Sequence, residues 1–334
     1  MKSALKYLKE ILFLLDEDRK KIPWMILIFW ISSLLDLVGL GLISPYIALI
    51  LRPESAEEGR LGELVKLLGF PQEQETLLLI LGFILLSVFL IKAIASIGIY
   101  YFIIRFGEKQ KIRIISRLVQ SYQALPYTTY LQRNSSEYIY NISALVKNFT
   151  GGVVQNGLRM LSDLIVAVMI FGLLAWNNAV ALGLLFVLLS TLVIVYDQIF
   201  RRKISLYGQQ MNQVWTLMIQ GIKESIEGLK EIRILGKEYY FYKNIRSNAN
   251  KSYSINILSS LITAGPRYLL ELIIISFVVM LITVTISSGQ NIHNLIGTLG
   301  LFGVASLRLV PTVNTGISTL LQLRQQRNTV SRLY

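Results

Sequence analysis

Apolar residues occur in six long stretches along the 334-residue chain, and polar or charged segments separate these stretches. An α-helix needs roughly 20 predominantly apolar residues to cross the hydrocarbon core of a bilayer. We therefore predict an all-α membrane protein with six long transmembrane helices in one domain over residues 23–325. The predicted spans are Trp24–Leu51, Thr76–Ile104, Leu158–Trp176, Ala179–Phe200, Leu258–Ser287 and Ile292–Leu323.

The helical pattern continues beyond the second predicted span. Between Arg105 and Leu125 the chain has no proline and one glycine, and its apolar residues keep helical spacing. At 1.5 Å per residue, this segment extends the helix by about 30 Å. Pro126 then ends the helix. A short segment follows at Tyr127–Gln132, and a second helix is predicted to begin near Ser135 and return to the bilayer.

The same pattern follows the fourth predicted span. Arg201–Gly221 is predicted to extend the helix, Lys223–Leu235 to turn, and Lys237–Ile257 to return. Structureless loops longer than about 12–15 residues are uncommon in compact domains. We therefore expect two helical extensions on one side of the membrane, each with a short segment at its tip.

The distribution of charge gives the orientation. Residues 1–22 hold six basic residues, 105–159 hold eight and 201–251 hold ten, whereas 52–75 hold three basic residues and six glutamates. Because positive charge is retained on the cytoplasmic side, both termini and both extensions are predicted to be cytoplasmic. The loops predicted to face outward are 52–75, 177–178 and 288–291.

Composition excludes several functions. Charged residues make up 16% of the chain, against about 25% in a soluble domain, and the net charge of +13 follows the membrane topology rather than a nucleic-acid surface. The chain has no cysteine and one histidine, so we predict no metal site. No G-x-x-x-x-G-K-[ST] string is present. We predict no catalytic residue and no cofactor on this chain.

Two segments have amphipathic patterns outside the spans. Apolar residues recur at helical spacing in residues 1–22, which predicts a helix that lies either on the inner membrane surface or on its own protein. A short helix at the outer interface is predicted within residues 52–75. Its apolar face would be formed by Leu61, Leu64, Val65 and Leu68.

Ionisable residues inside the spans are candidate functional residues, because a charge in the bilayer is costly. The cations are Lys92, Arg267 and Arg308. The candidate charge partners are Asp36, Asp163 and Glu271, and Glu271 follows Arg267 by four residues, so these two can pair on one helix face. The cations either contact an anionic substrate, or pair with these carboxylates or extend to an interface.

The two extensions carry motifs of a known family. Leu125–Tyr127 with Asn134–Glu137, and the segment Lys223–Gly236, resemble the two coupling regions of type I ABC exporters. This resemblance covers essentially the whole chain. It implies that the tips dock on nucleotide-binding domains, and the candidate coupling residues are Tyr127, Tyr130, Gln132, Glu227, Gly228 and Lys230.

Two further motifs narrow the resemblance. Pro266–Glu271 and Leu307–Asn314 resemble bacterial ABC flippases of lipid-linked oligosaccharides, in which cavity cations handle the pyrophosphate of the substrate. This implies candidate pyrophosphate contacts at Lys92, Arg267 and Arg308. Lysine at position 92 keeps the charge but loses the bidentate fork of arginine. The external helix of these flippases, which engages the polyprenyl tail, corresponds to the segment Leu61–Leu68. The alternative for this segment is a capping helix that only closes the outer end.

The resemblance implies the transmembrane subunit of an ATP-driven exporter in the bacterial inner membrane. Its expected partners are a second copy of the chain, membrane lipids, a polyprenyl-linked glycan, and a nucleotide-binding domain that binds ATP and Mg²⁺. Residues 326–334 are expected to begin a linker to that ATPase domain. Alternatives are an exporter of peptides or lipids, or a non-transporting scaffold or sensor. An ion-coupled carrier fits less well, since it has no use for long cytoplasmic extensions.

Overall fold

The computed structural model describes residues 2–51, 74–131, 134–177, 179–287 and 292–334. These residues contain helices and no strand, which confirms the all-α prediction. In chain order the elements are α1 (Lys2–Leu15), η1 (Asp16–Lys21), α2 (Ile22–Leu51), α4 (Gln74–Gln123), α5 (Tyr127–Leu131), α6 (Ser135–Tyr140), η3 (Asn141–Leu145), η4 (Asn148–Gln155), α7 (Asn156–Asn177), α8 (Ala179–Glu227), α9 (Leu229–Ile234), α10 (Glu238–Ser287), α11 (Ile292–Gln325) and α12 (Arg327–Leu333).

Among the residues that the structure describes, five helical segments are long and apolar enough to cross a membrane. They contain α2, α4, α7, α8 and α10, and so correspond to the first five predicted spans. The sixth predicted span is α11, a helix of 34 residues. It is not one of the five, and its described part carries Arg308, Asn314 and Gln322. The six long helices agree with the predicted architecture.

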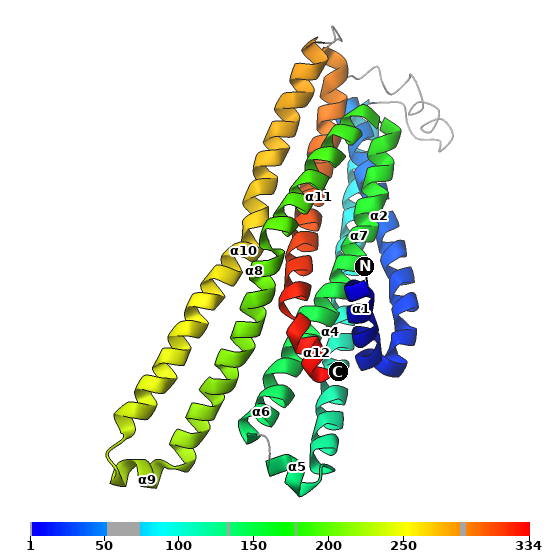
Figure 1. Ribbon diagram of the computed structural model, residues 1–334. Helices are drawn as coiled ribbons and strands as arrows, with labels where there is room; N and C mark the ends of the chain where they lie inside the picture. The colour runs from blue at the N-terminus through cyan, green and yellow to red at the C-terminus, as the bar shows by residue number, and fades with distance from the viewer. Residues whose placement is uncertain (1, 52–73, 132–133, 178, 288–291) are drawn as a thin grey trace.

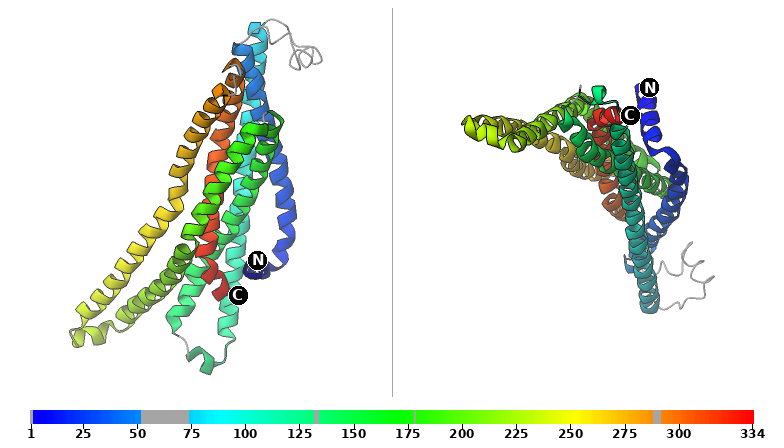
Figure 2. Two further views of the ribbon diagram at one scale, coloured as in Figure 1. Left: turned by 45° about the horizontal axis from the view of Figure 1, so that its top comes forward. Right: turned by 90° about the horizontal axis from the view of Figure 1, so that it is seen from below.

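The helices form two legs that extend from a common bundle (Figures 1 and 2). One leg consists of α4, the tip helix α5 and the returning α6, and the other consists of α8, the tip helix α9 and α10. Both predicted extensions are therefore confirmed as helices. The second descending helix runs past its predicted end at Gly221 to Glu227. Gly221 is buried against Ile245 of α10, so this glycine allows close helix packing instead of ending the helix.

Buried apolar residues form separate clusters in the bundle. One cluster joins the membrane parts of α7, α8, α10 and α11, with Ile170, Leu185, Leu270 and Leu309 among its members. A second joins α1, α2, α4, η4 and α12. Because these helices pack through their apolar faces, the clusters fix the positions of the polar side chains that lie between the helices.

The N-terminal helix packs on its own protein. Leu14 and Leu15 of α1 are buried in the cluster that contains Val330 of α12, and the Tyr7 hydroxyl donates a hydrogen bond to the Leu323 carbonyl at 2.9 Å. Leu8 and Phe13 of the same helix are exposed. The structure thus shows the second of the two alternatives, and contact of α1 with the membrane surface stays a prediction.

The last residues of the chain are folded against the bundle. Arg327–Leu333 forms α12, Val330 is fully buried, and Nη2 of Arg332 lies 2.9 Å from Oε1 of Glu137 on α6. Figure 1 shows the two termini close to each other beside α1 and α12. The expected connection from residues 326–334 to an ATPase domain stays a prediction.

A proline lies inside the continuous helix α10, at the level where Tyr196 of α8 contacts it. Pro266 has no N–H, so the carbonyl of Ile262, four residues earlier, loses its helical hydrogen bond. The Tyr196 hydroxyl of α8 donates a hydrogen bond to this carbonyl at 2.7 Å. A Cβ atom at Gly265 would lie 2.6 Å from the same hydroxyl, so only glycine leaves room for it. Pro266 therefore leaves the Ile262 carbonyl free to accept a hydrogen bond, and Gly265 leaves space for the Tyr196 hydroxyl that donates it.

We expect Tyr196→Phe to lower the free energy of unfolding by about 1–3 kcal/mol, because the buried Ile262 carbonyl is left without a partner. The measurement is the midpoint of thermal unfolding of the purified protein in detergent. Tyr207→Phe is the matched control, since Tyr207 lies on the same helix and the described residues give its hydroxyl no hydrogen bond. Equal midpoints for the two variants would contradict the assignment.

Candidate substrate cavity in the membrane domain

Asp36 lies at the centre of a buried ion-pair cluster. It is placed on the otherwise apolar α2 and is 1% exposed. Its Oδ1 lies 2.6 Å from Nζ of Lys92 on α4, and its Oδ2 lies 3.2 Å from Nη2 of Arg308 on α11. A buried carboxylate is tolerated only when it is paired. The one acidic residue of α2 therefore holds cations from two other helices.

A cavity of about 350 Å³ opens beside this cluster. Residues of α2, α4, α7 and α11 line it, and its polar lining residues are Ser32, Asp36, Ser96, Tyr100, Arg159, Ser162, Asp163 and Arg308. The guanidinium of Arg159 lies over the Tyr100 ring, 4.7 Å from its centroid. Lys92 does not line the cavity but contacts it through Asp36.

The charges of this site favour an anion. Lys92, Arg159 and Arg308 carry three positive charges, and Asp36 and Asp163 carry two negative charges when ionised. Arginine pairs bidentately with phosphate, and such charge-assisted hydrogen bonds are roughly twice as strong as neutral ones. The volume is at the low end of the range for ligand sites, about 300–1,000 Å³. The cavity is large enough for a small anionic group.

The structure brings four of the predicted site residues together. Asp36, Lys92 and Arg308 are in direct contact, and Asp163 lines the same cavity. Lys92 and Arg308 therefore pair with a carboxylate, which is one of the two alternatives for the cations. Arg308 also lines the cavity, so it can contact a substrate there as well.

Arg267 and Glu271 lie elsewhere. Nε of Arg267 lies 3.6 Å from Oε1 of Glu271, and both side chains are more than half exposed on α10. Neither residue lines the cavity that holds Arg308. Within a single chain, Arg267 is therefore apart from Lys92 and Arg308. A cavity role for Arg267 stays a prediction that requires a second copy.

Sequence reasoning missed Arg159 and Tyr100. Arg159 was counted among the basic residues of the cytoplasmic segment 105–159, although it lies in the first turn of α7. One signal was available, since Asp163 follows Arg159 by four residues and therefore lies on the same helix face. Nothing in the sequence pattern singles out Tyr100, and only the packing of α4 against α7 places its ring under Arg159.

The remaining predicted residues are at the tips or outside the described part of the chain. Leu61, Leu64, Val65, Leu68 and Gln132 lie outside the described residues. Tyr127 and Tyr130 belong to the tip helix α5, Glu227 ends α8, and Gly228 and Lys230 lie at the start of α9. Tyr127 is 73% exposed, and Glu227 pairs with Lys223 at 3.6 Å. Their role in docking stays a prediction.

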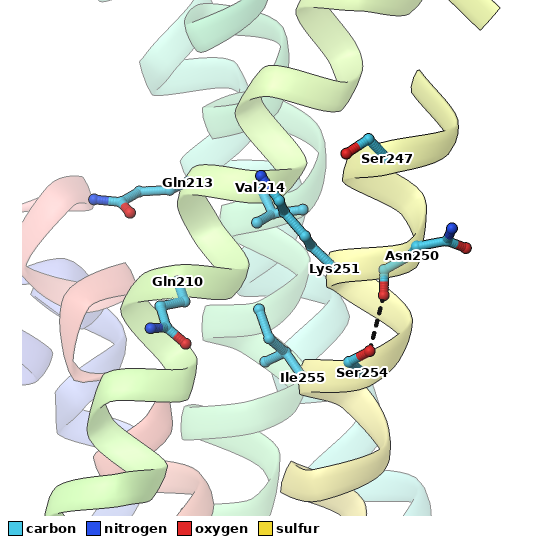
Figure 3. A pocket seen from close by; sticks show the side chains of 8 residues that line it. All are labelled: Gln210, Gln213, Val214, Ser247, Asn250, Lys251, Ser254 and Ile255. Carbon is cyan, nitrogen blue, oxygen red and sulfur yellow. Dashed lines mark hydrogen bonds between the residues drawn. The ribbon is translucent and has the colours of Figure 1, made fainter. Parts of the chain in front are cut away.

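A second cavity, of about 610 Å³, lies between α8 and α10 in the leg (Figure 3). Lys251 is the one charged side chain among the eight that line it, and Ser254 donates a hydrogen bond to the Asn250 carbonyl at 3.1 Å. The lining residues lie between the predicted fourth and fifth spans, in the leg formed by α8, α9 and α10. This cavity has no charge cluster like that around Asp36, so we do not assign a ligand to it.

Comparison with known protein families matches residues 25–306 to a family described as ABC transporter transmembrane region. The match covers well over half of the chain, from α2 into α11. It includes Asp36, Lys92, Arg159 and Asp163, and it ends just before Arg308.

Proposed function

We propose a flippase function for this chain, which belongs to the family of ABC transporter transmembrane regions. The chain is the membrane subunit of an ABC exporter. In our proposal the complete transporter moves a lipid-linked oligosaccharide, with a polyprenyl diphosphate anchor, across the bacterial inner membrane.

The observation that supports this cargo is the cation-rich cavity beside Asp36. A polyprenyl diphosphate glycan has an anionic segment between an apolar tail and a polar glycan. That segment has to cross a region of low dielectric constant, where an unpaired charge is costly. Arg159 and Arg308 line a cavity within the membrane bundle and offer partners for phosphate oxygens. The apolar tail would remain in the lipid, outside this small cavity.

Two partners complete the proposal. ABC transmembrane domains generally pair with nucleotide-binding domains, and the tips of both legs are the proposed docking surfaces. The α9 tip exposes large apolar residues, among them Ile234, Leu235, Tyr239 and Tyr240. A second copy of the chain would enclose the transport path between the two bundles. In this homodimer the exposed Arg267 is proposed to add a further cation from the neighbouring subunit.

The proposed mechanism follows from the length of the legs. ATP and Mg²⁺ bind to the nucleotide-binding domains, and their closure moves the tips α5 and α9. Because α8 and α10 are continuous helices of 49 and 50 residues, movement of the tip is carried into the membrane. The cavity cations keep the headgroup paired while the bundles open outward.

The test is nucleotide-dependent flipping in proteoliposomes. We expect the full chain with its ATPase subunit to flip a fluorescent polyprenyl diphosphate oligosaccharide when ATP is present. Liposomes without the ATPase subunit, or with a non-hydrolysable ATP analogue, are the controls and should show background flipping. Transport of peptides or phospholipids but not of the glycan would favour the alternative cargoes. ATP hydrolysis without any transport would favour a scaffold or sensor.

A further inference from the structure

The carboxylate of Asp36 lies between two cations, Lys92 and Arg308. An anionic headgroup would have to take this same position to pair with both. The two oxygens of Asp36 contact Lys92 at 2.6 Å and Arg308 at 3.2 Å. The side chains of Asp36 and Lys92 are 2% and 14% exposed, so water screens this contact little. An incoming anion therefore competes with a carboxylate that belongs to the protein.

The same carboxylate connects three helices. Asp36 comes from α2, Lys92 from α4 and Arg308 from α11, and these residues are far apart in the sequence. Each of the two contacts depends on the other, because removal of one cation leaves the Asp36 charge partly uncompensated. A ligand that displaces Asp36 thus also loosens the connection of α2 to α4 and α11.

Arg159 differs from the other two cations. Within the part of the chain that the structure describes, no carboxylate lies within ion-pair distance of its guanidinium, which instead lies over the Tyr100 ring. It faces the same cavity as Arg308. A phosphate can therefore pair with Arg159 before Asp36 is displaced.

We propose that Asp36 is a resident counter-ion, which neutralises Lys92 and Arg308 until the phosphate groups of the cargo replace it. The inference rests on the proposed function, since it assigns a second role within the same cavity. It also names the class of ligand. A diphosphate headgroup has enough acceptor oxygens and charge to pair with Lys92 and Arg308 together and to keep its contact with Arg159.

The experiment measures equilibrium binding of farnesyl diphosphate to the purified full-length chain in nanodiscs. We expect Asp36→Asn to bind this probe at least tenfold more tightly than the wild type, because the amide keeps the shape of the side chain but no longer competes as an anion. Asp197→Asn is the matched control. It removes a carboxylate that pairs with Arg324 at 2.8 Å and does not line the cavity, so its affinity should equal that of the wild type.

A second comparison keeps the test decisive if Asp36→Asn does not fold. Lys92→Gln is compared with the double variant Asp36→Asn/Lys92→Gln, in which one charge of each sign is removed and the net charge is that of the wild type. The double variant should bind farnesyl diphosphate at least tenfold more tightly than Lys92→Gln. Equal or weaker binding would overturn the inference.

The outcomes separate this inference from the proposed function. If the wild type binds the probe and Asp36→Asn binds it no more tightly, Asp36 is not a competing counter-ion, while the anion cavity stands. If only Asp36→Asn binds the probe, the counter-ion role is supported and the diphosphate cargo of the wild type is not. If neither binds, both the inference and the proposed cargo are wrong.

Discussion

Arg308→Ala should lower the number of glycan lipids flipped per ATP hydrolysed by at least about tenfold. Arg308 is the residue that both pairs with the buried Asp36 and lines the cavity. A hydrogen bond to a charged group contributes about 1.5–3 kcal/mol, and about 1.4 kcal/mol corresponds to a factor of ten. The measurement is flipping and ATP hydrolysis in the same proteoliposomes, with the ATPase subunit supplied.

The control for this variant is Arg308→Lys, which keeps the charge and removes the planar fork. It should retain pairing with Asp36 and lose part of the transport, so its value should lie between those of Arg308→Ala and the wild type. The thermal midpoint of each variant is recorded as well, because loss of one partner from a buried ion pair also destabilises the fold. Wild-type transport by Arg308→Ala would rule out the cavity as the path of the anion.

Among substitutions that add a single methyl group to this chain, Gly208→Ala should lower the free energy of unfolding the most. Gly208 is buried on α8 where the end of α11 crosses it. An added Cβ would lie 2.0 Å from the carbonyl oxygen of Gln325 and 2.8 Å from its carbonyl carbon. Both are backbone atoms, so the helices must separate. We expect a loss of about 3 kcal/mol or more, measured as a fall of several degrees in the unfolding midpoint.

Gly183→Ala is the matched control for this effect. Gly183 lies on the same helix, and among the described residues no side chain and no atom of another helix lies within 4 Å of the position its Cβ would take. Alanine is favoured over glycine in a helix by about 0.8–1.0 kcal/mol. The control should therefore be as stable as the wild type or slightly more stable. A similar loss for both variants would mean that the contact with Gln325 does not limit the packing.

Local patterns along the chain were sufficient to predict most of the architecture. The apolar stretches and the position of Pro126 predicted the helices and the first tip, and the motif Lys223–Gly236 placed the second. Helix boundaries were less accurate. The sequence predicts that the descending helix ends at Gly221. In the structure this glycine lies inside α8 and lets α8 pack close to α10. Only the packing partner, here Ile245, decides between these two uses of a glycine.

The candidate site was predicted in part for a related reason. The cost of a charge in a membrane identifies Asp36, Lys92 and Arg308 from the sequence, but it does not say which of them meet. Their contacts depend on the rotation of α2, α4 and α11 about their axes. Arg267 lies on another helix, α10, and its side chain is exposed away from the cluster. Arg159 was overlooked because it lies at the boundary between a basic segment and a span.

The contact between Tyr196 and Ile262 also determines where α10 can bend. A helix bends most readily where a backbone hydrogen bond is missing, and Pro266 removes one at this level. The phenol of Tyr196 fixes that same turn to α8 through a single directional hydrogen bond. The two halves of α10 can therefore change their mutual angle while the contact between Tyr196 and Ile262 stays in place. Rotation about this point would displace α9 by a large amount, because α10 begins at Glu238, 24 residues before Ile262, a distance of about 36 Å along the helix.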